Sequence, residues 1–327
     1  MKTLVEKFLF QIQDAIKIGE NAALKKKDKK IANVLITGLG GSGIGGKIVA
    51  QLTAKEVTIP IIVNNNYEIP NFVDQHTLVV TSSFSGNTEE TLAALKVAEQ
   101  KNAEIACITS GGKLLKIAKD KGYNHIVLPT ERSPRAMLTY SLVQQFYMLL
   151  NYNLISADFK QSLNDVIPLL EENLAEIKAE AHKVALGLHG KTAVLYSEAA
   201  FEGVVTRMRQ QINENAKALC WHHVLPEMNH NELVGWAGGK SEYAVVLLRS
   251  SFDHPRTSTR MDISKKIISK YTPTFFEISA KGNSFIAQSF YLILFGDWVS
   301  VYLSELYQVD SIEVNVIDYL KGELAKL

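Results

Sequence analysis

Two turns rich in glycine and hydroxyl side chains hold the groups of this 327-residue chain best suited to bind a small anion. Residues 34–46 predict an apolar strand, a glycine turn and a helix start, and residues 78–88 predict a second buried strand and a hydroxyl-rich turn before another helix. The first turn of a helix carries unpaired N–H groups and a partial positive charge, which attract anions without an arginine. The two turns therefore predict a phosphate site.

A dinucleotide site is the main alternative, because Gly38-Leu39-Gly40-Gly41-Ser42-Gly43 satisfies the pattern GxGxxG. That site also requires an acidic residue at the end of the next strand, about 20 residues on, to hold the ribose hydroxyls. The next expected strand, 60–63, ends instead in asparagines at 64–66, and Glu68 is the nearest acid. The missing carboxylate favours a phosphorylated small molecule over NAD, while a purely structural role for the glycines stays open.

Two further segments offer charged side chains. Arg135 follows a proline at the expected start of a helix, where it can face either a ligand or the solvent. Glu214 lies between two asparagines in the helical stretch 207–217, an unusual pattern because asparagine is only a moderate helix former. A reacting carboxylate and a solvated helix residue both remain possible for Glu214.

Residues 221–232 contain three histidines and two glutamates, a composition that a metal site could use. The HExxH and CxxC spacings are missing, and a proline separates His223 from His230, so the pattern disfavours a metal. We expect a loop leading into a helix capped by Asn229, with His230 projecting into the cleft. Histidine is well suited to move protons near neutral pH.

Charge and composition exclude several classes of protein. The formal net charge is +1, with 46% apolar and 21% charged residues, which predicts a globular protein with no nucleic-acid or membrane partner. Cys107 and Cys220 are expected to be buried free thiols in a reducing compartment. The first residues carry acids unlike a secretory signal, and no run approaches 18 apolar residues, so a cytoplasmic location is expected.

Short apolar runs alternate with helical patterns, which is typical of a parallel sheet covered by helices on both faces. After a helix over 3–18, the expected strands are 33–37, 60–63, 77–82, 104–108 and 125–128, and the expected helices are about 44–54, 88–101, 113–120 and 135–151. The rhythm pauses near residue 152 before a long helical region, and further strands are expected at 192–196, 243–248 and 274–278. We therefore expect two similar α/β units, 1–152 and 153–327, with the site in the cleft between them, beyond the carboxyl ends of the strands.

Six short motifs occur along the chain in a definite order. They are Gly-Gly-Ser-Gly-Ile-Gly-Gly at 40–46, Ser-Phe-Ser-Gly-Asn-Thr-Glu-Glu-Thr at 83–91, Ser-Pro-Arg at 133–135, Asn-Glu-Asn-Ala-Lys at 213–217, Asn-His-Asn-Glu at 229–232 and Ile-Asp-Tyr-Leu-Lys at 317–321. Together they resemble the bifunctional phosphoglucose/phosphomannose isomerase family, from about residue 33 onward. The resemblance implies two sugar isomerase (SIS) domains, each a three-layer α/β/α unit with a mainly parallel sheet flanked by helices.

The resemblance also implies a role for each matching residue. It implies that the substrate and its phosphate are bound by Gly41, Ser42, Ser83, Ser85 and Thr88. It implies that Glu214 is the base at C1 and C2 of the sugar and that Arg135 lies near the enediolate oxygens. His230 and Lys321 would assist ring opening. The family resemblance further implies a homodimer in which His230 reaches the neighbouring active site.

The implied reaction suits these residue types. One carboxylate can move a proton between adjacent carbons if a cation stabilises the enediolate, while the bound phosphate holds the sugar in place. Glucose 6-phosphate, mannose 6-phosphate and fructose 6-phosphate share this enediolate, so no metal or organic cofactor is expected.

One stretch departs from the family pattern, and two other functions stay open. The family's Pro-Thr-Pro-like stretch, whose threonine is associated with room for the mannose epimer, corresponds here to Val-Asp-Ser-Ile-Glu-Val at 309–314. The mannose activity is therefore the one to test. The alternatives are an isomerase of another sugar phosphate and a non-catalytic sugar-phosphate sensor. An amidotransferase is disfavoured, because no glutaminase-sized domain precedes residue 33.

Overall fold

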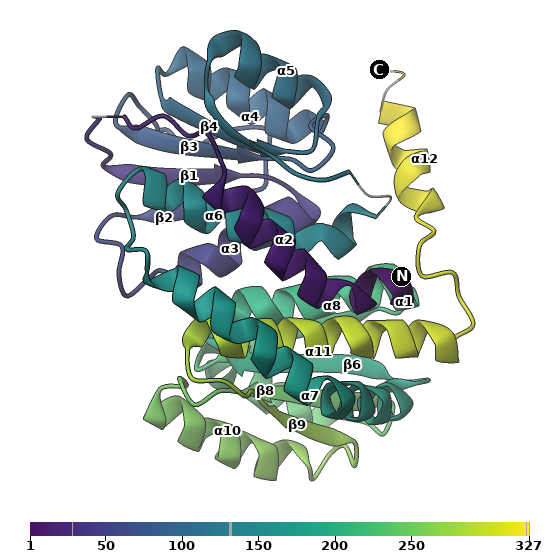
Figure 1. Ribbon diagram of the computed structural model, residues 1–327. Coiled ribbons are helices and arrows are strands. Elements are labelled where there is room, and N and C mark those ends of the chain that lie inside the picture. The colour runs from purple at the N-terminus through teal and green to yellow at the C-terminus, as the bar shows by residue number, and fades with distance from the viewer. Residues whose placement is uncertain (28, 131–132, 325, 327) are drawn as a thin grey trace.

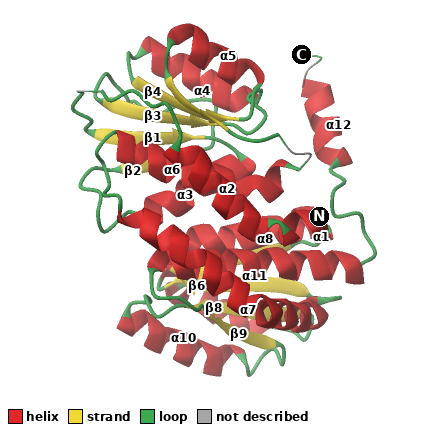
Figure 2. Cartoon of the chain, in the orientation of Figure 1, coloured by secondary structure: helices red, strands yellow, loops and turns green. Residues whose placement is uncertain are grey.

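Two parallel sheets, each with helices on both faces, form the framework of the protein. The computed structural model describes residues 1–27, 29–130, 133–324 and 326. Figures 1 and 2 show the layers in order: two helices, the first sheet, a thick central layer of helices, the second sheet and one outer helix. The expected architecture of two α/β/α units is confirmed.

The first sheet has the strand order β2-β1-β3-β4-β5, and its described strand pairs are parallel. Its strands are β1 (Asn33–Thr37), β2 (Ile61–Asn64), β3 (Thr77–Ser82), β4 (Glu104–Thr109) and β5 (Asn124–Val127). One face packs against α4 (Glu89–Gln100) and α5 (Gly112–Lys121), and the other faces α3 (Gly40–Leu52) and α6 (Leu138–Asn151). These strands match the apolar runs of the sequence, because a strand covered on both faces buries successive side chains.

The second sheet has the order β7-β6-β8-β9 and is also parallel. Its strands are β6 (Thr192–Glu198), β7 (Cys220–Leu225), β8 (Tyr243–Arg249) and β9 (Phe275–Ser279). The outer face packs against α10 (Pro255–Ile268), while α7 (Asp158–Leu188), α8 (Glu202–Ala216) and α11 (Phe285–Leu306) cover the inner face. Strand β7 was not predicted, because this edge strand carries polar and half-exposed side chains instead of an apolar run.

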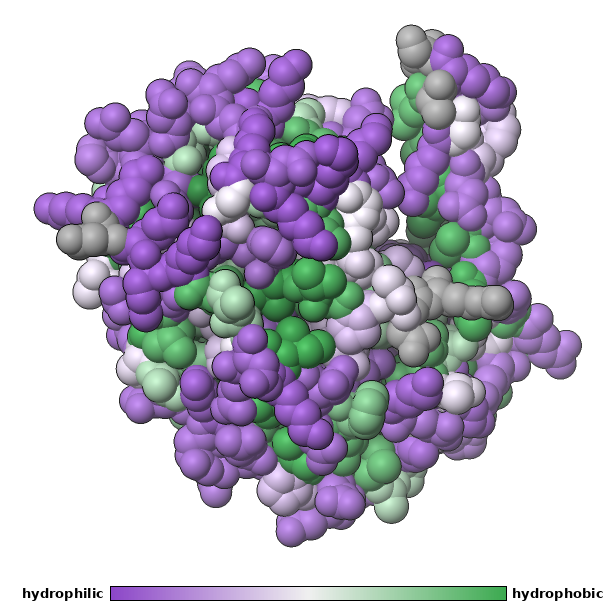
Figure 3. Space-filling model, turned by 45° about the horizontal axis from the view of Figure 1, so that its top comes forward, coloured by the Kyte–Doolittle hydropathy of each residue, from purple (hydrophilic) through white to green (hydrophobic). Residues whose placement is uncertain are grey.

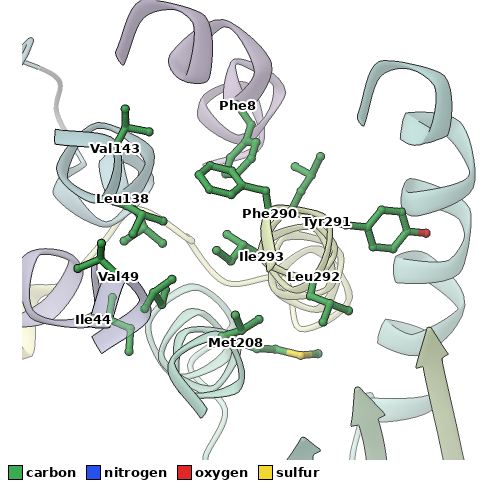
Figure 4. Packing of buried hydrophobic residues seen from close by; sticks show 14 of the residues in the cluster. Phe8, Ile44, Val49, Leu138, Val143, Met208, Phe290, Tyr291, Leu292 and Ile293 are labelled. Carbon is green, nitrogen blue, oxygen red and sulfur yellow. The ribbon is translucent and has the colours of Figure 1, made fainter. Parts of the chain in front are cut away.

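Helix α11 is the centre of the main core. Figure 4 shows its Phe290 and Ile293 among side chains from α3, α6, α8 and the N-terminal helix α2 (Phe8–Glu20). By length and composition α11 could cross a membrane, with a mean hydropathy of 1.3, but 94% of that window is buried inside the protein. Its apolar character is therefore explained by a position in the core. The expected helix over 3–18 is divided into α1 (Lys2–Glu6) and α2.

The last described helix, α12 (Asn315–Leu324), lies away from these layers. Its described residues include no buried one, and Val316, Tyr319 and Leu320 are exposed large hydrophobic residues. Figure 3 shows a hollow between this helix and the remainder of the molecule. The segment that leads into α12 is nevertheless held in place, because its backbone carbonyls contact two cations described below.

Candidate active site

The two hydroxyl-rich turns lie side by side at the carboxyl end of the first sheet. Strands β1 and β3 pair in register, with Thr37 opposite Thr81, so the turns that follow them are neighbours. In the second turn, the Ser83 hydroxyl lies 2.8 Å from the Thr88 hydroxyl and accepts a hydrogen bond from the Gly86 N–H at 3.1 Å. The Ser85 hydroxyl accepts from the Asn87 N–H at 3.3 Å.

Both turns lead into helices whose first N–H groups are available to a ligand. Among the described residues, no side chain caps the N-terminus of α3 or of α4. Ser42 is buried in the first turn of α3, within the positive end of that helix. Ser42, Ser83, Ser85 and Thr88 are thus brought to one edge of the sheet, where they and the helix N–H groups can bind a phosphate.

The glycines are required for the close packing of these turns. Gly86 has φ +68°, and a Cβ there would collide with the carbonyl oxygen of Gly111. A Cβ on Gly43 would lie 2.5 Å from the Gly38 carbonyl oxygen, which also accepts a hydrogen bond from Asn65 at 2.5 Å. Asn65 thus braces the glycine turn from the position at which a dinucleotide site would need a carboxylate.

Arg135 and Glu214 face each other beside the first turn. Arg135 belongs to a short 3₁₀ helix, η1 (Pro134–Met137), and a Cβ on Gly41 would lie 3.9 Å from its Cα. Its Nη1 lies 3.6 Å from Oε2 of Glu214, in the last turn of α8. The Arg135 side chain is 8% exposed and that of Glu214 is 32% exposed, so the cation is fixed in the protein and the carboxylate is open to a ligand.

Lys217 adds a second cation next to Glu214. It ends α8 in the left-handed conformation, with φ 55°, so its side chain turns back over the helix end. Its Nζ donates to the carbonyl oxygens of Glu214 at 2.7 Å and of Asp310 and Glu313, both at 2.8 Å. Burial lowers the pKa of Lys217 below its ordinary value. Sequence reasoning missed this role, because it depends on a segment 93 residues further along the chain.

His230 lies far from Glu214 within this chain. Glu214 is near the start of β7, whereas His230 is an exposed residue in η3 (Glu227–His230), just beyond the other end of that strand. A strand of six residues is about 20 Å long, which separates the two side chains. Lys321 is exposed on α12, and no contact described in the structure joins it to Glu214 or Arg135.

The loop that carries His230 is held by Glu232. The Glu232 carboxylate accepts from His223 Nδ1 at 2.8 Å, from Trp221 Nε1 at 3.2 Å and from the hydroxyl of Tyr196. No group of His, Cys, Asp and Glu side chains suited to a metal occurs among the described residues.

The prediction that Asn229 caps the following helix was wrong. Asn231 caps α9 (Glu232–Gly235), since its side chain accepts from the Glu232 N–H, whereas Asn229 donates to Ser264 at 2.8 Å. Both asparagines precede the helix, and the chain turns at η3 before α9 begins, so the residue immediately before the helix is the cap.

Comparison with known proteins identifies the family. A family model for the SIS domain matches residues 28–152, and one for the bacterial phospho-glucose isomerase C-terminal SIS domain matches residues 177–324. The chain is 38% identical to a bifunctional phosphoglucose/phosphomannose isomerase of Caldicellulosiruptor bescii, over 97% of this chain and 96% of the relative. It belongs to the bifunctional phosphoglucose/phosphomannose isomerase family.

Other similarities agree with this assignment. A family member of Aquifex aeolicus is 36% identical over 90% of both chains. The solved structure of a proposed phosphosugar isomerase from Clostridium difficile 630 matches with a TM-score of 0.79 and 16% identity, over 95% of this chain and 94% of that one. At that identity the structural match shows the fold alone.

Proposed function

We propose that this protein interconverts glucose 6-phosphate, mannose 6-phosphate and fructose 6-phosphate through an enediolate, without a metal or organic cofactor. The observation that carries this proposal is the position of Glu214, open to a ligand, opposite the buried Arg135 and beside the phosphate-binding turns. A general base, a cation for the enediolate oxygens and an anchor for the phosphate are the three parts that the reaction needs.

Each residue has a role in this mechanism. The hydroxyls of Ser42, Ser83, Ser85 and Thr88, with the backbone near Gly41, hold the phosphate. Glu214 then removes a proton from C1 or C2 and returns it to the adjacent carbon, while a hydroxyl proton moves between O1 and O2 of the enediolate. Arg135 presents Nη1 to the developing negative charge, because its other donors are already occupied by Asn215 and by the segment before α12. His230 and Lys321 assist ring opening.

We further propose a cytoplasmic homodimer in which His230 completes the active site of the other subunit. The distance between His230 and Glu214 within one chain supports this arrangement, since the two side chains lie beyond opposite ends of β7. Large hydrophobic side chains are exposed near this region: Leu219 is 87% exposed and Val234 is 78% exposed. A dimer interface would cover these two side chains. Lys321 would approach Glu214 and Arg135 if α12 packed over the hollow in Figure 3.

The departure from the family pattern at 309–314 leaves the contacts of this segment with the two cations intact, and the mannose assay tests its effect on the epimer. Arg135 contacts this segment through the carbonyl oxygens of Ser311 and Ile312, which any residue type provides. Lys217 likewise donates to the backbone carbonyl oxygens of Asp310 and Glu313, which do not depend on the residue type. We also propose that the functional units are 1–152, with the phosphate-binding turns, and 153–327, with Glu214, His230 and Lys321.

The test is a pair of coupled assays on purified, chelator-treated protein. One assay follows mannose 6-phosphate to fructose 6-phosphate, and the other follows fructose 6-phosphate to glucose 6-phosphate. We expect turnover in both. Activity on the glucose pair alone would restrict the function to phosphoglucose isomerisation. Folded protein that turns over neither pair would overturn the proposal and favour another sugar phosphate or a sensor.

A further inference from the structure

Asn215 connects the Arg135 side chain to the core of the protein. It is fully buried in the last turn of α8, next to Glu214. Its Oδ1 accepts from Arg135 Nε at 2.8 Å, and its Nδ2 donates to the Ser300 hydroxyl at 2.9 Å. Ser300 in turn donates to a carbonyl oxygen of the core helix α11, at 2.7 Å. Both ends of the Asn215 amide are therefore used, and its orientation is fixed.

Three groups of Arg135 are hydrogen-bonded within the protein, whereas its Nη1 faces Glu214. Nε is bonded to Asn215, and Nη2 donates to the carbonyls of Ile312, at 3.1 Å, and Ser311. The backbone carbonyl of Arg135 accepts from Arg207 at 2.7 Å. Arg207 is itself locked in a buried ion pair with Asp297 on α11. Nη1 alone points towards the Glu214 carboxylate, at 3.6 Å, which is longer than a direct hydrogen bond.

We propose that Asn215 is a positioning residue that keeps Arg135 and Glu214 apart, so that both remain available to the substrate. This inference rests on the proposed isomerase function. Without Asn215, the buried Nε–H of Arg135 would lose its acceptor, and a buried donor without an acceptor is destabilising. The nearby Glu214 carboxylate could then accept a hydrogen bond from Arg135. In such a direct ion pair, Glu214 would no longer be available to the sugar as a base, and Arg135 would no longer be available to the enediolate as a cation.

The remaining charges around this pair are unchanged when Asn215 is replaced by a neutral residue. The cations are Arg207 and Lys217, and the acids are Asp310 and Glu313, with the α-amino group of Met1 also near Arg135. A change in pH dependence between the variant and the wild type therefore reports on the separation of Arg135 from Glu214. A closer cation favours the ionised carboxylate, so the acidic limb of the pH–rate profile must move to lower pH.

The test compares Asn215→Leu with Asn213→Leu. Asn213 is the matched control, because it flanks Glu214 on the other side and donates to the Ala218 carbonyl at 2.8 Å instead of contacting Arg135. For Asn215→Leu we expect kcat on fructose 6-phosphate to fall by about 10- to 100-fold. We expect KM to change less than about threefold, since the phosphate turns are untouched, and the acidic limb to move down by about one pH unit. Asn213→Leu should leave that limb in place.

A second variant and a direct structural measurement complete the test. Ser300→Ala removes the acceptor of Asn215 Nδ2 but keeps the bond between Asn215 Oδ1 and Arg135. It should move the acidic limb in the same direction by a smaller amount, and it replaces Asn215→Leu if that variant does not fold. A crystal structure of the variant should show Nη1 of Arg135 within about 3.2 Å of Oε2 of Glu214. An unmoved limb and an unchanged separation would overturn the inference. If the wild type turns over neither hexose phosphate pair, the proposed function fails, but the separation in the crystal still decides the positioning role of Asn215.

Discussion

The carboxyl ends of the two sheets have the same topology but opposite chemistry. Strands β6, β7, β8 and β9 occupy the places that β1, β2, β3 and β4 have in the first sheet. In the first sheet, β1 and β3 lead into turns of glycine and serine with uncapped helices. In the second, β6 leads into Ala199–Phe201, and β8 leads into the loop 250–254, which contains its own acid.

In the second sheet, carboxylates of the chain accept hydrogen bonds from backbone N–H groups at the carboxyl end. Glu198, at the end of β6, accepts from the His254 N–H at 3.0 and 3.1 Å, and Asp253 accepts from the Ser250 N–H at 2.9 Å. Arg249 is likewise paired with Asp262 and Glu277. The comparison shows that the same topology carries different side chains at the carboxyl ends of the two sheets, and the proposed phosphate site follows from the side chains of the first.

The largest expected effect concerns Glu214, which we propose as the base that the second unit contributes to the active site. Glu214→Gln keeps the shape of the side chain but removes the base. We expect kcat to fall by about 10³-fold or more, because a general base contributes up to about 10⁴-fold. Coupled assays measure the loss, and thermal shift with fructose 6-phosphate shows whether binding survives. Retained turnover would remove Glu214 as the base and break the link between the halves.

A smaller effect is expected from removing a single serine hydroxyl at the carboxyl end of either sheet. Ser85→Ala, at the edge of the first sheet, should raise KM by about tenfold with little change in kcat, since a phosphate contact contributes to ground-state and transition-state binding alike. Ser251→Ala, in the loop after β8, is the matched control and should leave KM unchanged. Equal effects of the two substitutions on KM would show that phosphate binding is not confined to the carboxyl end of the first sheet.

The smallest effect concerns stability at the carboxyl end of the second sheet. Burial and the neighbouring Glu198 carboxylate raise the pKa of Asp253 to about 6. A raised pKa means that folding disfavours the ionised form, so the stability that this group contributes is complete below pH 3.8 and is lost as the pH rises through 6. Asp253→Asn should therefore be more stable than the wild type at pH 8, by about 1 kcal/mol after allowance for solvent screening, and equal to it near pH 4.

Urea denaturation at both pH values measures this difference. The neutral amide keeps an acceptor for the Ser250 N–H, so the comparison isolates the charge. A variant that is less stable than the wild type at pH 8 would show that the ionised Asp253 carboxylate stabilises the carboxyl end of the second sheet.

The sequence was most informative where one segment alone defines the structure. The turns at 38–46 and 82–88 could be predicted because strand, glycine and helix signals lie within a few residues of each other. The strand β7 could not, because Trp221 and His223 are the partly exposed side chains of an edge strand and resemble a loop. The segment Cys-Trp-His-His-Val-Leu at 220–225 shows neither a strict alternation of apolar and polar residues nor a continuous apolar run.

The contacts that fix the candidate site were outside the reach of sequence reasoning. Arg135 could equally have been a surface residue, and it is buried because Asn215 and the segment before α12, 80 or more residues away, surround it. The pair of Arg207 with Asp297 joins residues 90 positions apart. Such partners depend on how α8 and α11 pack, and no local pattern marks them.

The most direct test of the account is a crystal structure of the protein with glucose 6-phosphate bound. We predict that the phosphate lies between Ser42, Ser83, Ser85 and Thr88 at the carboxyl end of the first sheet. C1 and C2 should then lie within about 3–3.5 Å of the Glu214 carboxylate, as proton transfer requires. A phosphate bound at the carboxyl end of the second sheet, or a sugar whose C1 and C2 face away from Glu214, would contradict the account.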